Sequence, residues 1–154
     1  MILERDGYEI STDPGRLDRR AIHAFIRESY WAPGIPFELV DRSIDRSIPF
    51  GLYAPGGAQA GFARVVTDGA TFGYLADVFV LDEHRGRGLG VWLVETALAH
   101  ADLEHVRRVV LGTADAHSLY ERFGFRPADQ RIVMERFRDP KDIYGALAQR
   151  RSPG

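Results

Sequence analysis

The chain of 154 residues contains no cysteine, and lysine is almost absent. The lack of cysteine excludes disulfide bridges, a thiolate nucleophile and thiolate zinc ligands together. The 20 basic residues are 19 arginines and Lys141, so chemistry that needs a lysine has one candidate near the C-terminus. No apolar run approaches the roughly 18 residues typical of a membrane span. The sequence therefore predicts no membrane partner.

Other classes of signal are missing as well. Residues 1–6 lack the basic start and apolar stretch of an export signal, which favours a cytoplasmic protein. The net charge of −2 argues against nucleic acid as a partner. The five histidines show no metal-ligand spacing, so no metal is expected.

What is present is a globular composition, with 45% hydrophobic and 27% charged residues. The apolar pattern predicts one α/β domain over residues 1–154, with a mixed, mostly antiparallel sheet flanked by helices. Helices are expected at about 13–29, 37–47, 89–100 and 115–123. Strands are expected up to Ile10 and at about 50–54, 60–67, 72–81, 109–111 and 132–134. Asp68-Gly69 favours a tight hairpin turn, and residues 139–154 are expected to form a partly ordered tail.

A glycine-rich turn from Arg85 to Gly90 follows the predicted strand 72–81 and opens a predicted helix. Backbone N–H groups converge at a helix N-terminus, which carries a partial positive charge and favours phosphate. Glycine lets the backbone approach an anion closely, and Arg85 and Arg87 add bidentate donors. The segment predicts a phosphate site, with a turn that binds nothing as the alternative.

The spacing of this turn excludes two common nucleotide motifs. A P-loop needs a lysine after its second glycine, and no lysine lies nearby. The dinucleotide motif Gly-x-Gly-x-x-Gly fails because Val91 stands where the third glycine belongs, counting from Gly86 and Gly88. The pattern that remains is Arg-x-x-Gly-x-Gly, carried by Arg85, Gly88 and Gly90.

With this motif the chain resembles the GNAT superfamily of N-acetyltransferases, whose acyl-coenzyme A motif is Gln/Arg-x-x-Gly-x-Gly/Ala after the fourth strand. The resemblance implies that acetyl-CoA is the acetyl donor. It implies that Val78, Phe79 and Val80, on a strand splayed from its neighbour, pair with the pantetheine arm, and that the Val80 N–H meets the oxyanion. The residues implied to hold the pyrophosphate through their backbone are Gly86, Arg87, Gly88, Leu89, Gly90 and Val91.

A second motif, from Asp115 to Phe125, resembles the family signature Ala-x-x-Leu-Tyr-x-x-x-Gly-Phe. The resemblance implies that Tyr120 donates a proton to the departing thiolate. The alternative is a core role, because Tyr120 lies on an apolar stripe with helical spacing. Thr113 replaces the asparagine that many members carry seven residues before the tyrosine, so Thr113 or Asp115 would have to supply that contact with the donor.

Acetyl transfer to an amine requires a neutral nitrogen. An alkylammonium with a pKa near 10.4 carries a deficit of roughly 4 to 5 kcal/mol at pH 7, so a base is needed. Asp77 is the expected base, because strand alternation turns it to the face opposite Val78 and Val80. Glu83 and His84 are alternatives, and a structural role for Asp77 is equally supported.

The expected function is direct transfer of an acetyl group to a primary amine of a small molecule or protein. A non-catalytic acyl-CoA-binding regulatory module on the same fold is the alternative. Trp31 and Phe37, in an aromatic and proline-rich loop, are expected to line the acceptor site, with packing between helices as the other interpretation. The sequence is compatible with a homodimer.

Overall fold

A six-stranded sheet organises residues 1–151, the part of the chain that the computed structural model describes. The strands follow sequence order across the sheet; β1 to β5 are antiparallel, and β5 and β6 are parallel. The strands are β1 (Ile2–Arg5), β2 (Tyr8–Ser11), β3 (Ile48–Tyr53), β4 (Gln59–Thr67), β5 (Gly73–Val80) and β6 (Val109–Val110). The expected mixed, mostly antiparallel sheet is confirmed.

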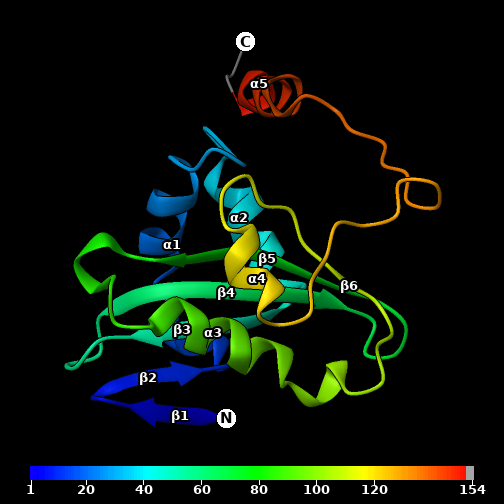
Figure 1. Ribbon diagram of the computed structural model, residues 1–154. Helices are drawn as coiled ribbons and strands as arrows, with labels where there is room; N and C mark the ends of the chain where they lie inside the picture. Colours follow the sequence, from blue (N-terminus) through cyan, green and yellow to red (C-terminus); the bar gives the residue numbers. More distant parts are fainter. Residues whose placement is uncertain (152–154) are drawn as a thin grey trace.

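Helices cover both faces of this sheet (Figure 1). One face packs against α1 and α2, and the other against α3 and α4. The helices are α1 (Arg19–Ile26), α2 (Phe37–Asp45), α3 (Leu89–Leu98), α4 (His117–Glu121) and α5 (Pro140–Arg151), with short 3-10 turns η1 (Pro14–Arg16), η2 (Asp82–His84) and η3 (Ala101–Leu103). Among the residues described, no helix is long and apolar enough to cross a membrane.

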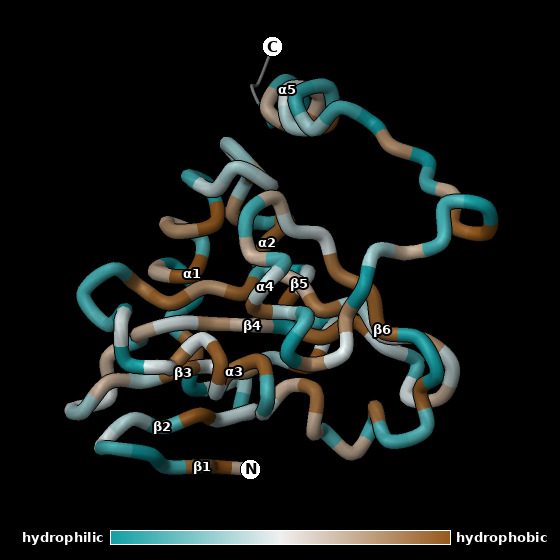
Figure 2. The backbone as a smooth tube through the Cα atoms, viewed as in Figure 1, coloured by the Kyte–Doolittle hydropathy of each residue, from teal (hydrophilic) through white to brown (hydrophobic). Residues whose placement is uncertain are grey.

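Two apolar clusters, one on each face, hold the layers together. Phe62 and Phe79 pack with Ile22 and Ile26 of α1 on one face. The other cluster is larger and centres on α3, which is buried along most of its length. Segments of hydrophobic residues lie around the sheet, whereas the residues of the long connection before α5 are mostly hydrophilic (Figure 2).

Two predictions near the N-terminus are corrected. The expected helix over 13–29 is interrupted, because Asp13 caps only the 3-10 turn η1, and α1 begins after a second cap, Asp18, whose side chain accepts from the Ala21 N–H. The first expected strand is a hairpin, β1 and β2. Its turn holds Asp6 and Gly7, both at positive φ.

The connection between β4 and β5 is a five-residue loop over 68–72 and not a two-residue turn. The Asp68 carboxylate organises it by accepting the N–H groups of Ala70, Thr71 and Phe72 and the Thr71 hydroxyl. These hydrogen bonds hold the pKa of Asp68 well below its usual range.

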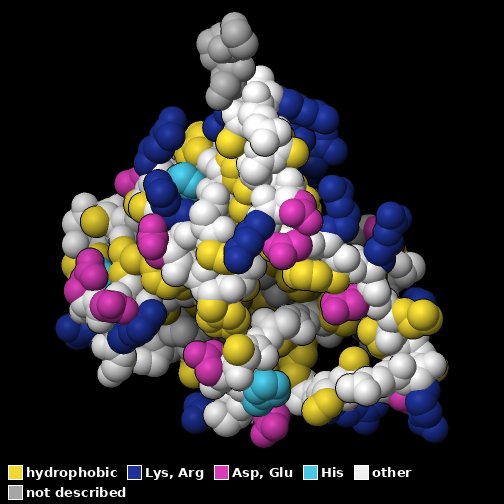
Figure 3. Space-filling model, turned by 90° about the horizontal axis from the view of Figure 1, so that it is seen from above, with side chains coloured by type: hydrophobic (Ala, Val, Ile, Leu, Met, Phe, Trp, Pro, Cys, Tyr) yellow, Lys and Arg dark blue, Asp and Glu magenta, His cyan; other side chains and the backbone are white. Residues whose placement is uncertain are grey.

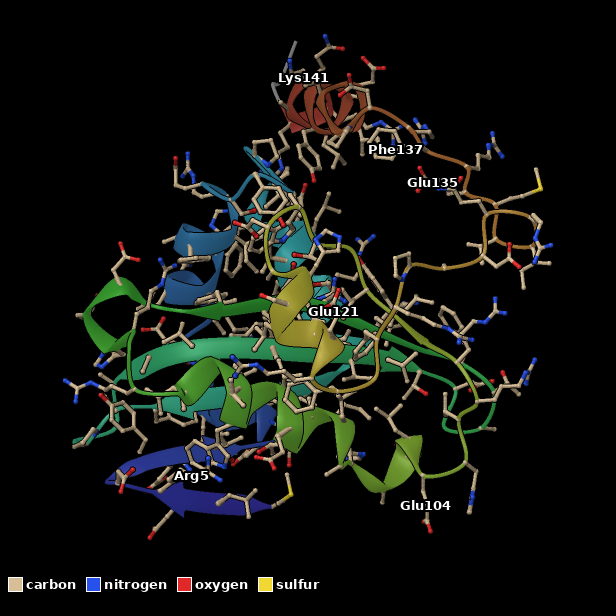
Figure 4. All side chains as sticks on the ribbon, viewed as in Figure 1. Arg5, Glu104, Glu121, Glu135, Phe137 and Lys141 are labelled. Carbon is tan, nitrogen blue, oxygen red and sulfur yellow. The ribbon has the colours of Figure 1, made fainter. Side chains whose placement is uncertain are left out.

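The strand expected at 132–134 is absent. Residues 126–139, here named the strap, run away from the sheet to α5 (Figure 1). The Asp129 carbonyl oxygen accepts the N–H groups of both Ile132 and Val133, which turns these donors away from a strand ladder. Ile132 and Met134 are exposed. Glu135 and Phe137 lie on the strap apart from the sheet, and Lys141 lies on α5, in the segment expected to be a partly ordered tail (Figure 4).

Gly61 on β4 provides a test of how closely β4 and β5 approach. A Cβ at this position would lie 2.6 Å from the carbonyl oxygen of Phe79, which belongs to the backbone of β5 and cannot swing aside. We expect Gly61→Ala to lower the free energy of unfolding by about 1 to 3 kcal/mol, as overpacking does. Gly145→Ala on α5 meets open space and is the control, with no loss expected in urea denaturation. Equal stability of the two variants would contradict the close approach.

Candidate functional site

The candidate site is the gap where β5 parts from β6. The two strands pair only at Gly73 with Val109 and at Tyr74 with Val110. Beyond these pairs a cavity of about 1070 Å³ opens, lined by residues 74–80 of β5, the segment 111–116 and part of the loop after α1. The face seen from above carries hydrophobic side chains around a hollow (Figure 3). The expected divergence of the two strands is therefore present.

A β-bulge at Asp77 lies in the middle of the cavity wall. The register of β5 against β4 shifts between Phe62 and Arg64, so that Asp77 and Val78 together face Ala63. Asp77 adopts φ +53°, a left-handed conformation that aspartate tolerates better than most residues. Such a bulge bends its strand and increases the local twist. It accompanies the divergence of β5 from β6.

The backbone of β5 presents a free hydrogen-bonding group to this gap. Leu81 donates its N–H to the carbonyl oxygen of Ala60 on β4. In an antiparallel ladder alternate residues point their N–H groups in opposite directions. The N–H of Val80 is therefore directed away from β4, toward the side of the cavity.

The turn from Arg85 to Gly90 leads into α3 beside the same cavity. Gly86 and Gly88 have φ values of +77° and +73°, which glycine adopts without strain. Gly88 is the N-cap of α3, and no side chain accepts the first N–H groups of the helix. These groups have no acceptor within the helix either. The start of α3 is thus open to an anion.

The two arginines of the turn differ in their surroundings. Arg85 donates from Nε to the Val80 carbonyl oxygen at 3.0 Å and pairs with Asp82 at 2.9 Å. It therefore joins the end of β5 to the turn. Arg87 is exposed and forms no ion pair within residues 1–151, so its guanidinium is available to a ligand.

Tyr120 on α4 lines the cavity and is 9% exposed. Its ring packs edge-on against Phe125, with 5.9 Å between centroids. Burial raises the pKa of Tyr120, and the nearby Tyr30 and Asp115 add to the shift. The phenol is therefore protonated throughout the neutral range and can act as a hydrogen-bond donor.

Asp77 contacts residues on the face of the sheet opposite Val78 and Val80, and its carboxylate is held by two donors. Arg64 Nε donates to Oδ2 at 2.7 Å, and Trp31 Nε1 donates to Oδ1 at 2.9 Å. The side chains of Arg64 and Asp77 are only 15% and 11% exposed. Charge-assisted bonds of this kind fix a carboxylate in one orientation.

The loop after α1 brings a further aromatic residue, Tyr30, to this cavity. The Tyr30 hydroxyl accepts the N–H of Ala114 at 3.0 Å, which joins the loop to the segment that follows β6. Burial, followed by the negative charge of Asp77, raises the pKa of Tyr144 on α5.

Several residues selected from the sequence lie outside the cavity lining. Phe37 packs against His23 and under the guanidinium of Arg20. His84 Nδ1 lies 3.0 Å from the Tyr8 hydroxyl, and Glu83 is exposed on the same 3-10 turn. Thr113 does line the cavity, but its hydroxyl accepts the N–H of Ala116. Trp31, Asp77, Val78, Phe79, Val80, Arg85, Gly90 and Tyr120 are brought together there.

Sequence reasoning missed Arg64, whereas Tyr30 belongs to the aromatic and proline-rich loop expected to line the acceptor site. One signal for Arg64 was available, because an arginine inside a strand of buried residues needs a partner of opposite charge. In the described part of the chain, no group of three or more histidine and acidic residues could hold a metal ion.

Comparisons with known proteins agree with this geometry. Residues 49–127 match the family model described as an acetyltransferase (GNAT) domain. A candidate acetyltransferase of Gibberella zeae is 35% identical, over 75% of this chain and 77% of that protein.

Solved structures give the same result. The crystal structure of a candidate GNAT acetyltransferase from Xanthomonas campestris pv. campestris has 45% identity, a TM-score of 0.84, and coverage of 89% of this chain and 97% of that one. A GNAT acetyltransferase from Elizabethkingia anophelis, solved with acetyl-CoA bound, shares the fold at 17% identity and a TM-score of 0.61, over 81% and 80% of the two chains. The chain therefore belongs to the GNAT family of acetyltransferases.

Proposed function

We propose that this protein is an N-acetyltransferase that transfers an acetyl group from acetyl-CoA to a primary amine. The observation that carries the proposal is the cavity between β5 and β6. It is lined by Gly90 near the open N-terminus of α3, and also by Asp77 and Tyr120. A thioester donor and an amine could meet there.

The donor side is built mainly from backbone. We propose that the N–H groups from Gly86 to Val91 bind the pyrophosphate, assisted by the exposed Arg87. Val78, Phe79 and Val80 would pair with the pantetheine arm along the part of β5 that β6 leaves unpaired. Added-strand pairing of this kind supplies main-chain hydrogen bonds without side-chain specificity. The residues present therefore fit acetyl-CoA.

In the proposed reaction the amine nitrogen forms a bond to the thioester carbonyl carbon, the carbon–sulfur bond breaks, and sulfur leaves with the electron pair. Tyr120 gives its proton to that sulfur, and Asp77 accepts a proton from the nitrogen through water. The Val80 N–H donates to the carbonyl oxygen as negative charge develops on it. The proton balance then closes between Asp77 and Tyr120 through solvent.

The second candidate is a regulatory module that binds acyl-CoA without turnover. The same cavity and the same open helix end would serve it, since a fold with a donor site does not by itself establish catalysis. Release of free coenzyme A thiol in the presence of amines separates the two functions.

Acetyl-CoA binding provides the first test. At 100 times its dissociation constant, acetyl-CoA should stabilise the protein by about 2.7 kcal/mol if it binds only the native state. Arg87→Ala should raise the dissociation constant about 10-fold, because one charge-assisted contact is lost. The exposed Arg46 at the end of α2 gives the matched control, Arg46→Ala, with unchanged affinity expected in calorimetry. No thermal shift with acetyl-CoA would exclude both candidate functions.

Tyr120→Phe tests the proton donor. The phenylalanine ring keeps the contact with Phe125 and removes only the hydroxyl. We expect kcat to fall about 100-fold, within the range for a general acid, with acetyl-CoA affinity unchanged. Stopped-flow detection of the free thiol measures the rate. An unchanged kcat would leave Tyr120 with a packing role alone.

Asp77→Asn tests the base. We expect a fall in kcat of about 100-fold at pH 7 that becomes smaller as the pH rises toward the pKa of the amine, because the neutral fraction of the amine increases about tenfold per pH unit. Glu83→Gln is the control, since Glu83 is an exposed carboxylate outside the cavity lining. A loss that is the same at every pH would indicate that Asp77 is structural.

A further inference from the structure

We propose that the acceptor is a small monoamine whose amino group is attached to a flat, apolar substituent, such as an arylalkylamine. This proposal rests on the proposed acetyl transfer and specifies its acceptor. It is carried by an array of aromatic rings that leads to Asp77, together with the distribution of charge around that carboxylate.

The aromatic rings form a continuous series from the surface to the core. Tyr30 lies edge-on to Trp31, with 5.2 Å between centroids. Trp31 is 6.4 Å from Phe25, and Phe25 stacks on Phe79 at 4.0 Å. Phe79 is 5% exposed, whereas Trp31 and Tyr30 are 38% and 57% exposed. The outer two rings therefore retain surface that a ligand can cover.

These outer rings are held in place. The Tyr30 hydroxyl accepts the N–H of Ala114, and Trp31 donates its indole N–H to Asp77. Each ring is thus fixed at its polar end and offers its apolar surface to the cavity that both line. Aromatic side chains fixed in this way bind flat apolar groups at a low cost in conformational entropy.

Trp31 lies beside Asp77, where it can contact the substituent of an amine that approaches this carboxylate. Because its indole nitrogen lies 2.9 Å from Asp77 Oδ1, a nitrogen approaching Asp77 comes close to the indole. The apolar surface of the ring can then contact the substituent of an amine whose nitrogen lies near Asp77. Asp77 and Trp31 together suit the two groups of an arylalkylamine.

The charges around the cavity disfavour a polyamine. The acidic residues that line it are Glu28, Asp77 and Asp115. Asp77 is paired with Arg64 in a largely buried ion pair, and the exposed Glu28 lies 3.5 Å from Arg27, so two of the three carboxylates already have a cation beside them. Several ammonium groups on one acceptor would lack partners of opposite charge. One amino group suits this arrangement.

The position of α5 favours a small molecule over a protein chain. Arg151 at its end forms an ion pair with Glu38 of α2. Figure 1 shows α5 above the helices α1 and α2. A helix at this place limits the room available to a folded acceptor.

The experiment compares kcat/KM for 2-phenylethylamine, n-butylamine, spermidine and a lysine-containing peptide, measured as release of free thiol from acetyl-CoA. We expect kcat/KM for 2-phenylethylamine to exceed that for n-butylamine at least 10-fold, which is within the range of discrimination that hydrophobic pockets provide. Trp31→Ala should reduce that ratio to about twofold, whereas Trp31→Phe, which keeps a ring and loses the hydrogen bond to Asp77, should retain most of it.

Two further variants separate recognition from folding. Tyr30→Ala removes a more exposed ring and should also reduce the ratio. This variant provides the test if Trp31→Ala does not fold. Phe72→Ala removes an aromatic side chain of similar exposure, 42%, that does not line the cavity, and should leave the ratio unchanged.

Each outcome bears on one proposal or the other. A preference for spermidine, n-butylamine or the peptide would overturn the arylalkylamine proposal and leave acetyl transfer intact. The same holds if Trp31→Ala and Tyr30→Ala both fold and leave the ratio unchanged. Binding of acetyl-CoA without thiol release for any of the four amines would overturn acetyl transfer, and the acceptor proposal with it.

Discussion

The separation of β5 from β6 is the feature on which the candidate site depends. Parallel pairing stops after Tyr74, and the bulge at Asp77 follows three residues later. If the two strands stayed paired, their backbone groups would satisfy each other and the cavity would close. Because they diverge, the Val80 N–H is directed toward open space, and the start of α3 borders the same space. The fold thus provides unpaired backbone donors at two neighbouring places.

The conformation of Asp77 has an energetic cost that its partners offset. A left-handed conformation costs a non-glycine residue of order 1 kcal/mol or more, and the desolvation of a largely buried carboxylate adds to this. Arg64 comes from the neighbouring strand and Trp31 from the loop after α1, and both donate to the carboxylate. The same two contacts join β4, β5 and the N-terminal helices at one point. The strained residue is therefore held by two other parts of the chain, as is typical of functional positions.

Local chemistry explains which features were predictable from the sequence. The sheet type, α2, α3 and the glycine turn depend on short patterns, and the structure contains them. The absent strand at 132–134 had the composition of a strand. Two of its backbone N–H groups donate to the carbonyl oxygen of Asp129 and so do not pair with a neighbouring strand. The composition of the segment does not reveal this hydrogen bonding. The bulge depends on pairing between β4 and β5, and the contacts of Trp31 and Tyr30 link residues 46 and 84 positions apart. Such contacts leave no periodic signal in the sequence.

The two ends of the cavity also differ in whether they depend on a short local pattern or on contacts between distant residues. The donor end uses N–H groups from one short segment, so glycines at fixed spacing are required, and a motif records them. The proposed acceptor end uses side chains from the loop after α1, from β4 and β5 and from the segment after β6. Each can change without disturbing the backbone that the donor end needs. A chain can therefore keep the glycine motif that marks the family while the side chains around its acceptor change.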